Sequence, residues 1–144
     1  MLAKLLPLVP DDARCYCEAF AGSAALLLAK PRHPVEVIND ANRDLVALMR
    51  NAHYHLPALL EEMHWFIASR ADLEDFKAQP GLTEIQRAAR FLLRHRISFG
   101  ADGASFAVTK TQNKGFDRDG VSEALEVVRR RLNRVVVENL PYER

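Results

Sequence analysis

Two strand-like runs with a helix-like segment between them limit the fold of this chain more than any other feature. The run "RCYCEAF", residues 14–20, spaces Cys and aromatic residues by two, which predicts a buried β-strand, and "VEVIND", residues 35–40, predicts a second strand. Between them "GSAALLLAK" predicts a helix, and "ANRDLVALMRNAHYHL" predicts another after the second strand. The order strand, helix, strand, helix is typical of a parallel sheet with crossover helices, so we expect an α/β fold.

The middle of the chain has a different pattern. The segments "PALLEEMHWFIASR", "ADLEDFKAQ" and "TEIQRAARFLLRHRISF" are predicted to be helices with no strand between them, and Thr83 and Gln86 have the spacing of a capping box. A polar segment, residues 100–120, predicts a long loop, and loops of that length are often functional. A last helix, "VSEALEVVRRRLNR", and a third strand, "VVVEN", follow. We therefore predict a core part in 1–53, a helical insertion with its loop in 54–119, and a return to the core in 120–144.

Composition describes a soluble globular protein with a real core, since 49% of the 144 residues are hydrophobic and 27% are charged. The net charge of +1 argues against a protein that coats DNA by bulk charge, but a local basic patch is enough to bind phosphates. No apolar run approaches the roughly 20 residues that a membrane span needs, and no secretion signal is visible. We expect a cytoplasmic protein without a membrane partner.

Cysteine and histidine usage gives no sign of a metal site. Cys15 and Cys17 lie two apart on the first predicted strand, too close to pair with each other, and we expect them to be reduced, buried thiols. A C-x-C pair lacks the second pair of ligands that zinc needs, so zinc is the weaker alternative. The 5 histidines have no metal-ligand spacing and are interpreted as surface or helix-end residues. Trp65 and Phe66 are expected to pack the helical insertion.

Polar residues follow the first two predicted strands at the edge where open parallel sheets bind ligands. The segment Glu18–Gly22 follows the first strand, and Asp40 ends the second. Gly22 lets a ligand approach the backbone, and an Asp about 20 residues past a glycine turn is well placed to bind ribose hydroxyls. The G-x-G-x-x-G fingerprint of dinucleotide sites is absent. A nucleoside without a pyrophosphate is therefore predicted, which points to S-adenosylmethionine.

These segments resemble the D12 class of N6-adenine DNA methyltransferases, the Dam-like family. "EAFAGSAALLLAK" is similar to that family's E-P-F-x-G-[SG]-[GA] motif, and "VEVINDANRDLVALMR" to its strand that ends in N-D-x-N-x-x-L. "IQRAARFLLRHRISFGADGASF" and "RLNRVVVENLPYER" are similar to later segments of the family. The resemblance implies part of a Rossmann-like S-adenosylmethionine-dependent methyltransferase fold, with a mainly helical insertion as its target-recognition region.

The resemblance also implies cofactor contacts, residue by residue. By position they are Glu18, Phe20, Ala21, Gly22, Ser23, Asp40, Ala41, Asn139 and Leu140. Asp40 is implied to bind the ribose, with Asn42 beside it. Asn139 replaces an Asp that is often found there, and Ala19 replaces the family's Pro.

The family's catalytic motif is missing from this sequence. In the family, D-P-P-Y holds the amino group of a flipped adenine, and the similar "NLPYE" at 139–143 lies one motif too early. We therefore predict no catalytic residue here. The implied activity is methyl transfer from S-adenosylmethionine to N6 of adenine in duplex DNA, and we expect this chain to be an inactive N-terminal portion of such an enzyme.

Basic residues in the insertion are the predicted DNA contacts: Arg87, Arg90, Arg94, Arg96, Lys110, Lys114 and Arg118. The first three share one helix face, and a solvated helix face remains the alternative interpretation. The basic run from Arg129 to Arg134 ends a predicted helix, where the macrodipole favours positive charge, and this explanation is sufficient for it.

A second hypothesis assigns the chain to a different functional class. The chain would then be a non-catalytic remnant of prophage type that binds DNA or a protein partner through its helical part. An incomplete sheet exposes an edge strand, which predicts a homodimer through that edge.

Overall fold

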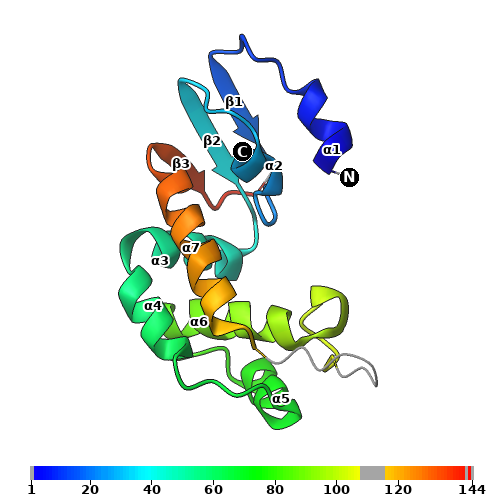
Figure 1. Cartoon of the computed structure of the whole chain (residues 1–144), viewed down its shortest axis with the longest axis vertical. Coiled ribbons are helices and arrows are strands. Elements are labelled where there is room, and N and C mark those ends of the chain that lie inside the picture. Colours follow the sequence, from blue (N-terminus) through cyan, green and yellow to red (C-terminus); the bar gives the residue numbers. More distant parts are fainter. Residues whose placement is uncertain (1, 108–115, 142, 144) are drawn as a thin grey trace.

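A parallel sheet lies at one end of the molecule and a group of helices at the other (Figure 1). The computed structural model describes residues 2–107, 116–141 and 143. The sheet has three strands in the order β1 (Cys15–Glu18), β2 (Val35–Asn39) and β3 (Val135–Glu138), and both pairings are parallel. The predicted α/β organisation with a parallel sheet is therefore confirmed.

Helices connect the strands in the predicted order. The short helix α1 (Leu2–Leu5) and the 3₁₀ helix η1 (Leu6–Leu8) precede β1, and α2 (Ala25–Ala29) connects β1 to β2. The connection from β2 to β3 contains α3 (Arg43–Tyr54), α4 (Leu56–Met63), α5 (Arg70–Ala78), α6 (Glu84–Ile97), the 3₁₀ helix η2 (Phe99–Ala101) and α7 (Arg118–Leu132). In Figure 1, α7 runs from the group of helices back to the sheet, where it leads into β3.

The start of α6 carries the predicted cap in a shifted form. Thr83 Oγ1 accepts a hydrogen bond from the Gln86 N–H at 3.1 Å, as a capping box requires. The Gln86 side chain, however, accepts from the Leu82 N–H at 3.2 Å, one residue before the position that the motif predicts. The sequence signal therefore located the helix start correctly.

Two apolar cores are joined by α3 and α7. The sheet core consists of Ala21, Ala24, Leu27, Ile38, Met49 and Leu132. The helical core consists of Ala52, Leu56, Leu59, Met63, Ala88, Ala89, Leu93, Val121 and Leu125. Helix α3 supplies a residue to each core, and Val128 of α7 packs against both. The sheet and the group of helices therefore share packed side chains.

Only one face of the sheet is buried in the described part of the chain. Ile38, on the face that the helices cover, is 1% exposed. Val35 and Val136, on the opposite face, are 50% and 48% exposed. Cys15 and Cys17 lie on that opposite face and are exposed free thiols, so the prediction of buried cysteines is wrong. The alternation of side chains along β1 turns both sulfurs away from the core.

Two further predictions from residue type are corrected by the structure. Phe66 packs edge-on against Phe116, with ring centroids 5.4 Å apart, but Trp65 is 80% exposed and does not pack the helical part. His33 is 8% exposed and is neither a surface nor a helix-end residue. Its Nε2 lies 2.9 Å from the Pro10 carbonyl and its Nδ1 lies 2.9 Å from Lys30 Nζ.

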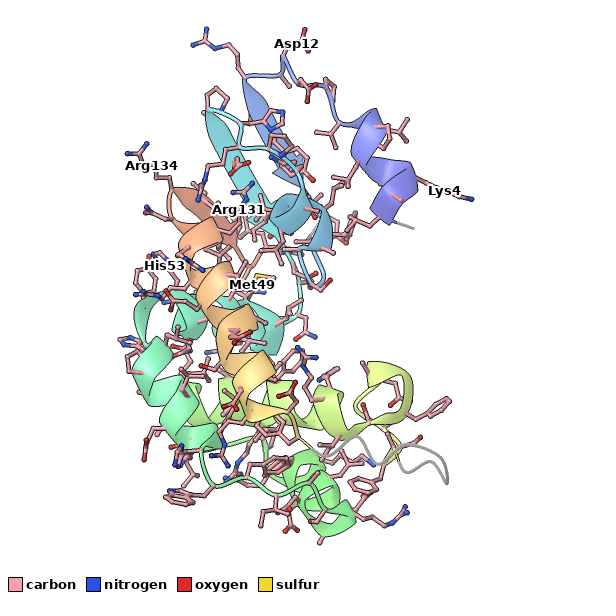
Figure 2. The ribbon with its side chains drawn as sticks, in the orientation of Figure 1. Lys4, Asp12, Met49, His53, Arg131 and Arg134 are labelled. Atoms are coloured by element: carbon pink, nitrogen blue, oxygen red, sulfur yellow. The ribbon has the colours of Figure 1, made fainter. Side chains whose placement is uncertain are left out.

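A buried carboxylate, Glu36 on β2, ties the sheet to α7. Glu36 is 3% exposed, and the guanidinium of Arg131 contacts both of its oxygens at 2.5 and 2.7 Å. Figure 2 shows Arg131 where α7 meets the sheet. Lys30 and the His33 N–H also donate to Glu36. Burial acts to raise the pKa of Glu36, but the hydrogen bonds from Arg131, Lys30 and His33 together lower it to about 2.

The Glu36→Gln variant tests how much this buried charge contributes to the stability of the fold. It should lower the free energy of unfolding at pH 7 by about 3 kcal/mol, because the buried Lys30 and the half-buried Arg131 lose their counter-charge. The folded-state pKa lies below the ordinary value of 4.5, so the stabilisation is present above pH 4.5 and is lost as the pH falls towards about 2. Denaturant titrations at pH 7 and pH 3 measure both effects.

The matched control is Glu126→Gln, which removes an exposed carboxylate that pairs with Arg129 inside α7. This variant should unfold like the wild type at both pH values. Equal losses in the two variants would contradict the assignment of Glu36 as the anchor.

Candidate functional site

Side-chain hydrogen bonds join the carboxyl ends of the three strands. Asn39, the last residue of β2, donates from Nδ2 to the carbonyls of Ala19 and Leu140, both at 3.0 Å, and accepts from the Leu140 N–H at 2.8 Å. Asn139 Nδ2 donates to the Asp40 carbonyl at 2.7 Å. The segments that follow β1, β2 and β3 are therefore held together at one edge of the sheet.

The carboxylate of Asp40 bridges the two turns that follow β1 and β2. Its Oδ2 accepts from the Gly22 N–H at 2.8 Å, across 18 residues of sequence, and its Oδ1 accepts from the Asn42 N–H at 2.8 Å. Each carboxylate oxygen has more than one acceptor position. The half-buried Asp40 can therefore orient both turns and still accept a hydrogen bond from a ligand hydroxyl.

The turn after β1 leaves open space beside its backbone. Gly22 has a φ of 51°, in the left-handed region, and a Cβ built there would meet no atom within 4 Å. Ala24 has a φ of 53° at the start of α2, and the Ala21 N–H donates to the Asn39 carbonyl at 2.8 Å. A ligand can thus reach the Gly22 backbone without displacing a side chain.

Glu18, at the end of β1, is held by one of its two oxygens. Oε1 accepts from the Leu27 N–H at 2.8 Å and from the Tyr16 hydroxyl at 2.7 Å. Burial, followed by the hydrogen bond to Glu18, raises the pKa of Tyr16, so this hydroxyl remains a donor. Within the described residues Oε2 has no hydrogen-bond partner, which leaves it available to a ligand cation.

The other predicted cofactor residues lie around the same edge. Phe20 is 73% exposed and Leu140 is 39% exposed, while Ser23 and Ala41 are also exposed. The structure therefore brings the predicted set together at the ends of the strands. Their role in binding a cofactor stays a prediction.

A cavity of about 510 Å³ extends from the Gly22 turn to the helices. Gly22, Ser23 and Asn42 line it on the sheet side, and α6 contributes Phe91, His95 and Arg96. Much of the remaining lining is apolar, from Leu45, Met49, Val121, Val128 and other residues of α3 and α7. Its size and its few polar groups are typical of small-ligand sites.

Phe91 and His95 line this cavity, and the sequence analysis did not single them out. His95 Nδ1 lies 2.7 Å from the Phe91 carbonyl, and the two rings stand 4.2 Å apart. Their spacing of four residues places them on one helix face. That signal was present in the sequence, but nothing local indicates that this face lies opposite Gly22.

The predicted DNA contacts have different surroundings. Arg87 forms an ion pair with Asp44 at 2.6 Å, and Arg90 donates to the Gln79 carbonyl at 2.7 Å. The buried Nε of Arg94 has no partner in the described part of the chain. Arg96 and Arg118 are exposed, and Arg96 reaches the 510 Å³ cavity. Lys110 and Lys114 lie outside the described residues.

The comparison with protein families decides the class of this protein. The family model for D12 class N6 adenine-specific DNA methyltransferases matches residues 1–113. The chain belongs to this family. The resemblance predicted from the motifs is confirmed, and the match includes the Gly22 turn, Asp40 and all of α6. It ends before α7, so the likeness of "RLNRVVVENLPYER" to the family is not part of it. No curated protein matches the chain significantly.

Membership in this family supports a methyltransferase, from a class that acts on DNA. Among the described residues, no helix is long and apolar enough to cross a membrane. In the same part of the chain, no group of three or more His, Cys, Asp or Glu side chains could hold a metal ion.

Replacing Asp40 with Ala should loosen both turns at once. The variant leaves the Gly22 and Asn42 N–H groups without their acceptor, so unfolding should become easier by about 2 kcal/mol. Amide exchange measured by NMR should become at least roughly tenfold faster at both positions, because their protection depends on these bonds.

Asp102→Ala is the matched control, since Asp102 Oδ1 also accepts two backbone N–H groups, from Ala104 and Ser105. It should leave exchange at Gly22 unchanged. Unchanged protection in Asp40→Ala would show that the bridge does not hold the turns.

Proposed function

We propose that this chain forms the donor-binding part of a methyltransferase that acts on N6 of adenine in duplex DNA, with S-adenosylmethionine as the methyl donor. The observation that supports this most is the bridge from Asp40 to the Gly22 N–H, which lies in the segment that the family model matches. It holds an acidic side chain and an open glycine backbone side by side at the ends of two parallel strands.

The residues at this edge fit the chemical groups of the donor. Glu18 Oε2 would accept from the ammonium group, and the remaining acceptor positions of Asp40 would take the ribose hydroxyls. Asn139 and Leu140 border the same edge from β3. When bound, the donor supplies a methyl group on a positively charged sulfur; the protein residues orient it and exclude water.

The arrangement of the strands supports a Rossmann-like sheet as part of this proposal. The order β1-β2-β3 is one half of a doubly wound order, in which a further strand pairs with the other edge of the first. In the described part of the chain that edge of β1 is unpaired. We propose residues 54–119 as the helical insertion that reads the target, with 1–53 and 120–144 in the core.

The 510 Å³ cavity suggests where the target base approaches. An adenine inside a duplex must leave the stack before its amino group can react. Phe91, His95 and Arg96 of α6 line the same cavity as the Gly22 turn. We propose that α6 faces the DNA here, with Arg96 near the phosphates and the aromatic rings near the extruded base.

Catalysis itself needs groups that this sequence does not contain. The exocyclic nitrogen of adenine is a weak nucleophile until its hydrogens are accepted and its lone pair is aimed at the methyl group. The family's D-P-P-Y motif does this, and the 144 residues contain no such motif. We expect these residues by themselves to bind the donor without transferring its methyl group.

A pair of glycine variants tests donor binding. Gly22 and Gly100 have φ values of 51° and 62°, and a Cβ at either would meet no atom within 4 Å. Gly22→Ala and Gly100→Ala should therefore each cost about 1 kcal/mol of stability. Only Gly22→Ala should weaken S-adenosylhomocysteine binding, by roughly tenfold or more in calorimetry, because its methyl group fills the ligand's space.

Equal affinities in the two variants would remove Gly22 from the site. A wild-type chain that binds duplex DNA but no donor would instead favour the non-catalytic binding module.

An arginine pair tests the DNA side. Arg96→Ala should weaken binding of a short duplex several-fold and reduce its salt dependence by about one counterion, as loss of one phosphate contact predicts. Arg129→Ala is the control, because Arg129 already pairs with Glu126 at 2.8 Å. Fluorescence anisotropy over a salt series measures both variants. Equal salt slopes for wild type and Arg96→Ala would contradict the placement of DNA at α6.

A further inference from the structure

A second cavity, of about 730 Å³, opens between α3 and β3. Its apolar lining comes from Val46, Met49, Leu132, Val135 and Val137. Met49 and Leu132 also line the 510 Å³ cavity, so they form a wall between the two. No residue of the Gly22 turn lines the second cavity, and Asn139 is the one residue of the proposed donor set that does.

Charge at the rim of this cavity is mainly positive. Arg50 and Arg134 line it, and in the described part of the chain neither forms an ion pair or a hydrogen bond. Glu138 is the acidic member of the lining. Arg87 and Arg131, by contrast, are paired with carboxylates elsewhere in the fold. Two uncommitted guanidinium groups beside an apolar surface suit a phosphorylated ligand with an apolar part.

Arg134 occupies a backbone position where glycine would be more stable. Its φ is 68°, and it follows the C-cap residue Asn133 of α7, a place that glycine usually fills. A left-handed conformation is unfavourable for an L-residue with a Cβ. An arginine therefore stands at the rim of the cavity, although glycine would make the local backbone more stable.

Two aromatic rings complete the cavity from the end of α3. His53 Nδ1 lies 3.1 Å from the Arg129 carbonyl; since that oxygen can only accept, Nδ1 carries the proton and the ring is fixed. Tyr54 stands edge-on to His53 at 4.7 Å and is 69% exposed. Figure 2 shows His53 and Arg134 on the same side of the molecule, with Met49 further in and the Arg134 side chain extended outward.

We propose that this cavity binds a nucleotide. Its phosphate would lie between Arg50 and Arg134, and its base would lie on the apolar residues against Tyr54. The methyl donor has no phosphate, so the two sites select different ligands. A free mononucleotide and the 5′-phosphorylated end of a DNA strand offer the same chemistry, and the test distinguishes them. This inference does not rest on the proposed function.

The probe is AMP, titrated into the full chain by calorimetry with S-adenosylhomocysteine present in excess to fill any donor site. We expect AMP to bind with an affinity in roughly the micromolar to low millimolar range, and adenosine, which lacks the phosphate, at least about tenfold more weakly. The same titration with single-stranded DNA, with and without a 5′-phosphate, shows the source. Tighter binding of the phosphorylated strand than of AMP assigns a strand end, and the reverse assigns a free nucleotide.

Arg134→Gly separates binding from folding. It relieves the left-handed backbone, so the Tm should stay the same or rise, while AMP affinity should fall roughly fivefold or more. Arg50→Ala should weaken AMP similarly. Arg14→Ala, at an exposed arginine before β1 that does not line the cavity, is the control and should bind AMP like the wild type. Unchanged AMP affinity in Arg134→Gly and Arg50→Ala, or no binding of either phosphorylated probe by the wild type, would overturn the proposal.

Discussion

The rest of this structure depends on one buried charge, the carboxylate of Glu36 in the central strand. A carboxylate away from water is stable only when donors surround it. Its donors come from the chain just before β2, through Lys30 and His33, and from Arg131, which lies 95 residues later. The requirement to pair this charge brings α7 back to the sheet. Once α7 is fixed there, β3 pairs beside β2, and the polar ends of all the strands meet at one edge.

Local features of the fold could be predicted because they depend on neighbours in the sequence. The order of strands and helices followed from hydrophobic periodicity, and Thr83 marked the start of α6. The exposure of Cys15 and Cys17 could not be predicted in this way, because it depends on which face of the sheet receives helices. The burial of His33 likewise depends on a contact with Pro10, 23 residues earlier.

The candidate site also has a part that could be predicted from the sequence and a part that could not. Gly22 and Asp40 could be placed together from the sequence, because parallel strands end at the same edge of their sheet. The approach of α6 to that edge could not, since its position is set by packing in the helical core and by the ion pair from Arg87 to Asp44. Charge spacing indicated a shared helix face for the arginines. It could not distinguish arginines that pair with other groups of the protein from arginines that remain available to a ligand.

The packing of Val128 against both cores has a consequence for how this protein can change during evolution. The sequence pattern of residues 54–119 is that of a separate insertion. Helix α7, however, begins at Arg118, inside this range, and its side chains pack in both the helical core and the sheet core. A recombination event that replaced only residues 54–119 would pack new helices against most of the original α7. Under the proposed function, target specificity is therefore expected to diversify by substitution on the cavity side of α6, while the packed contact between α3 and α7 is inherited as a unit.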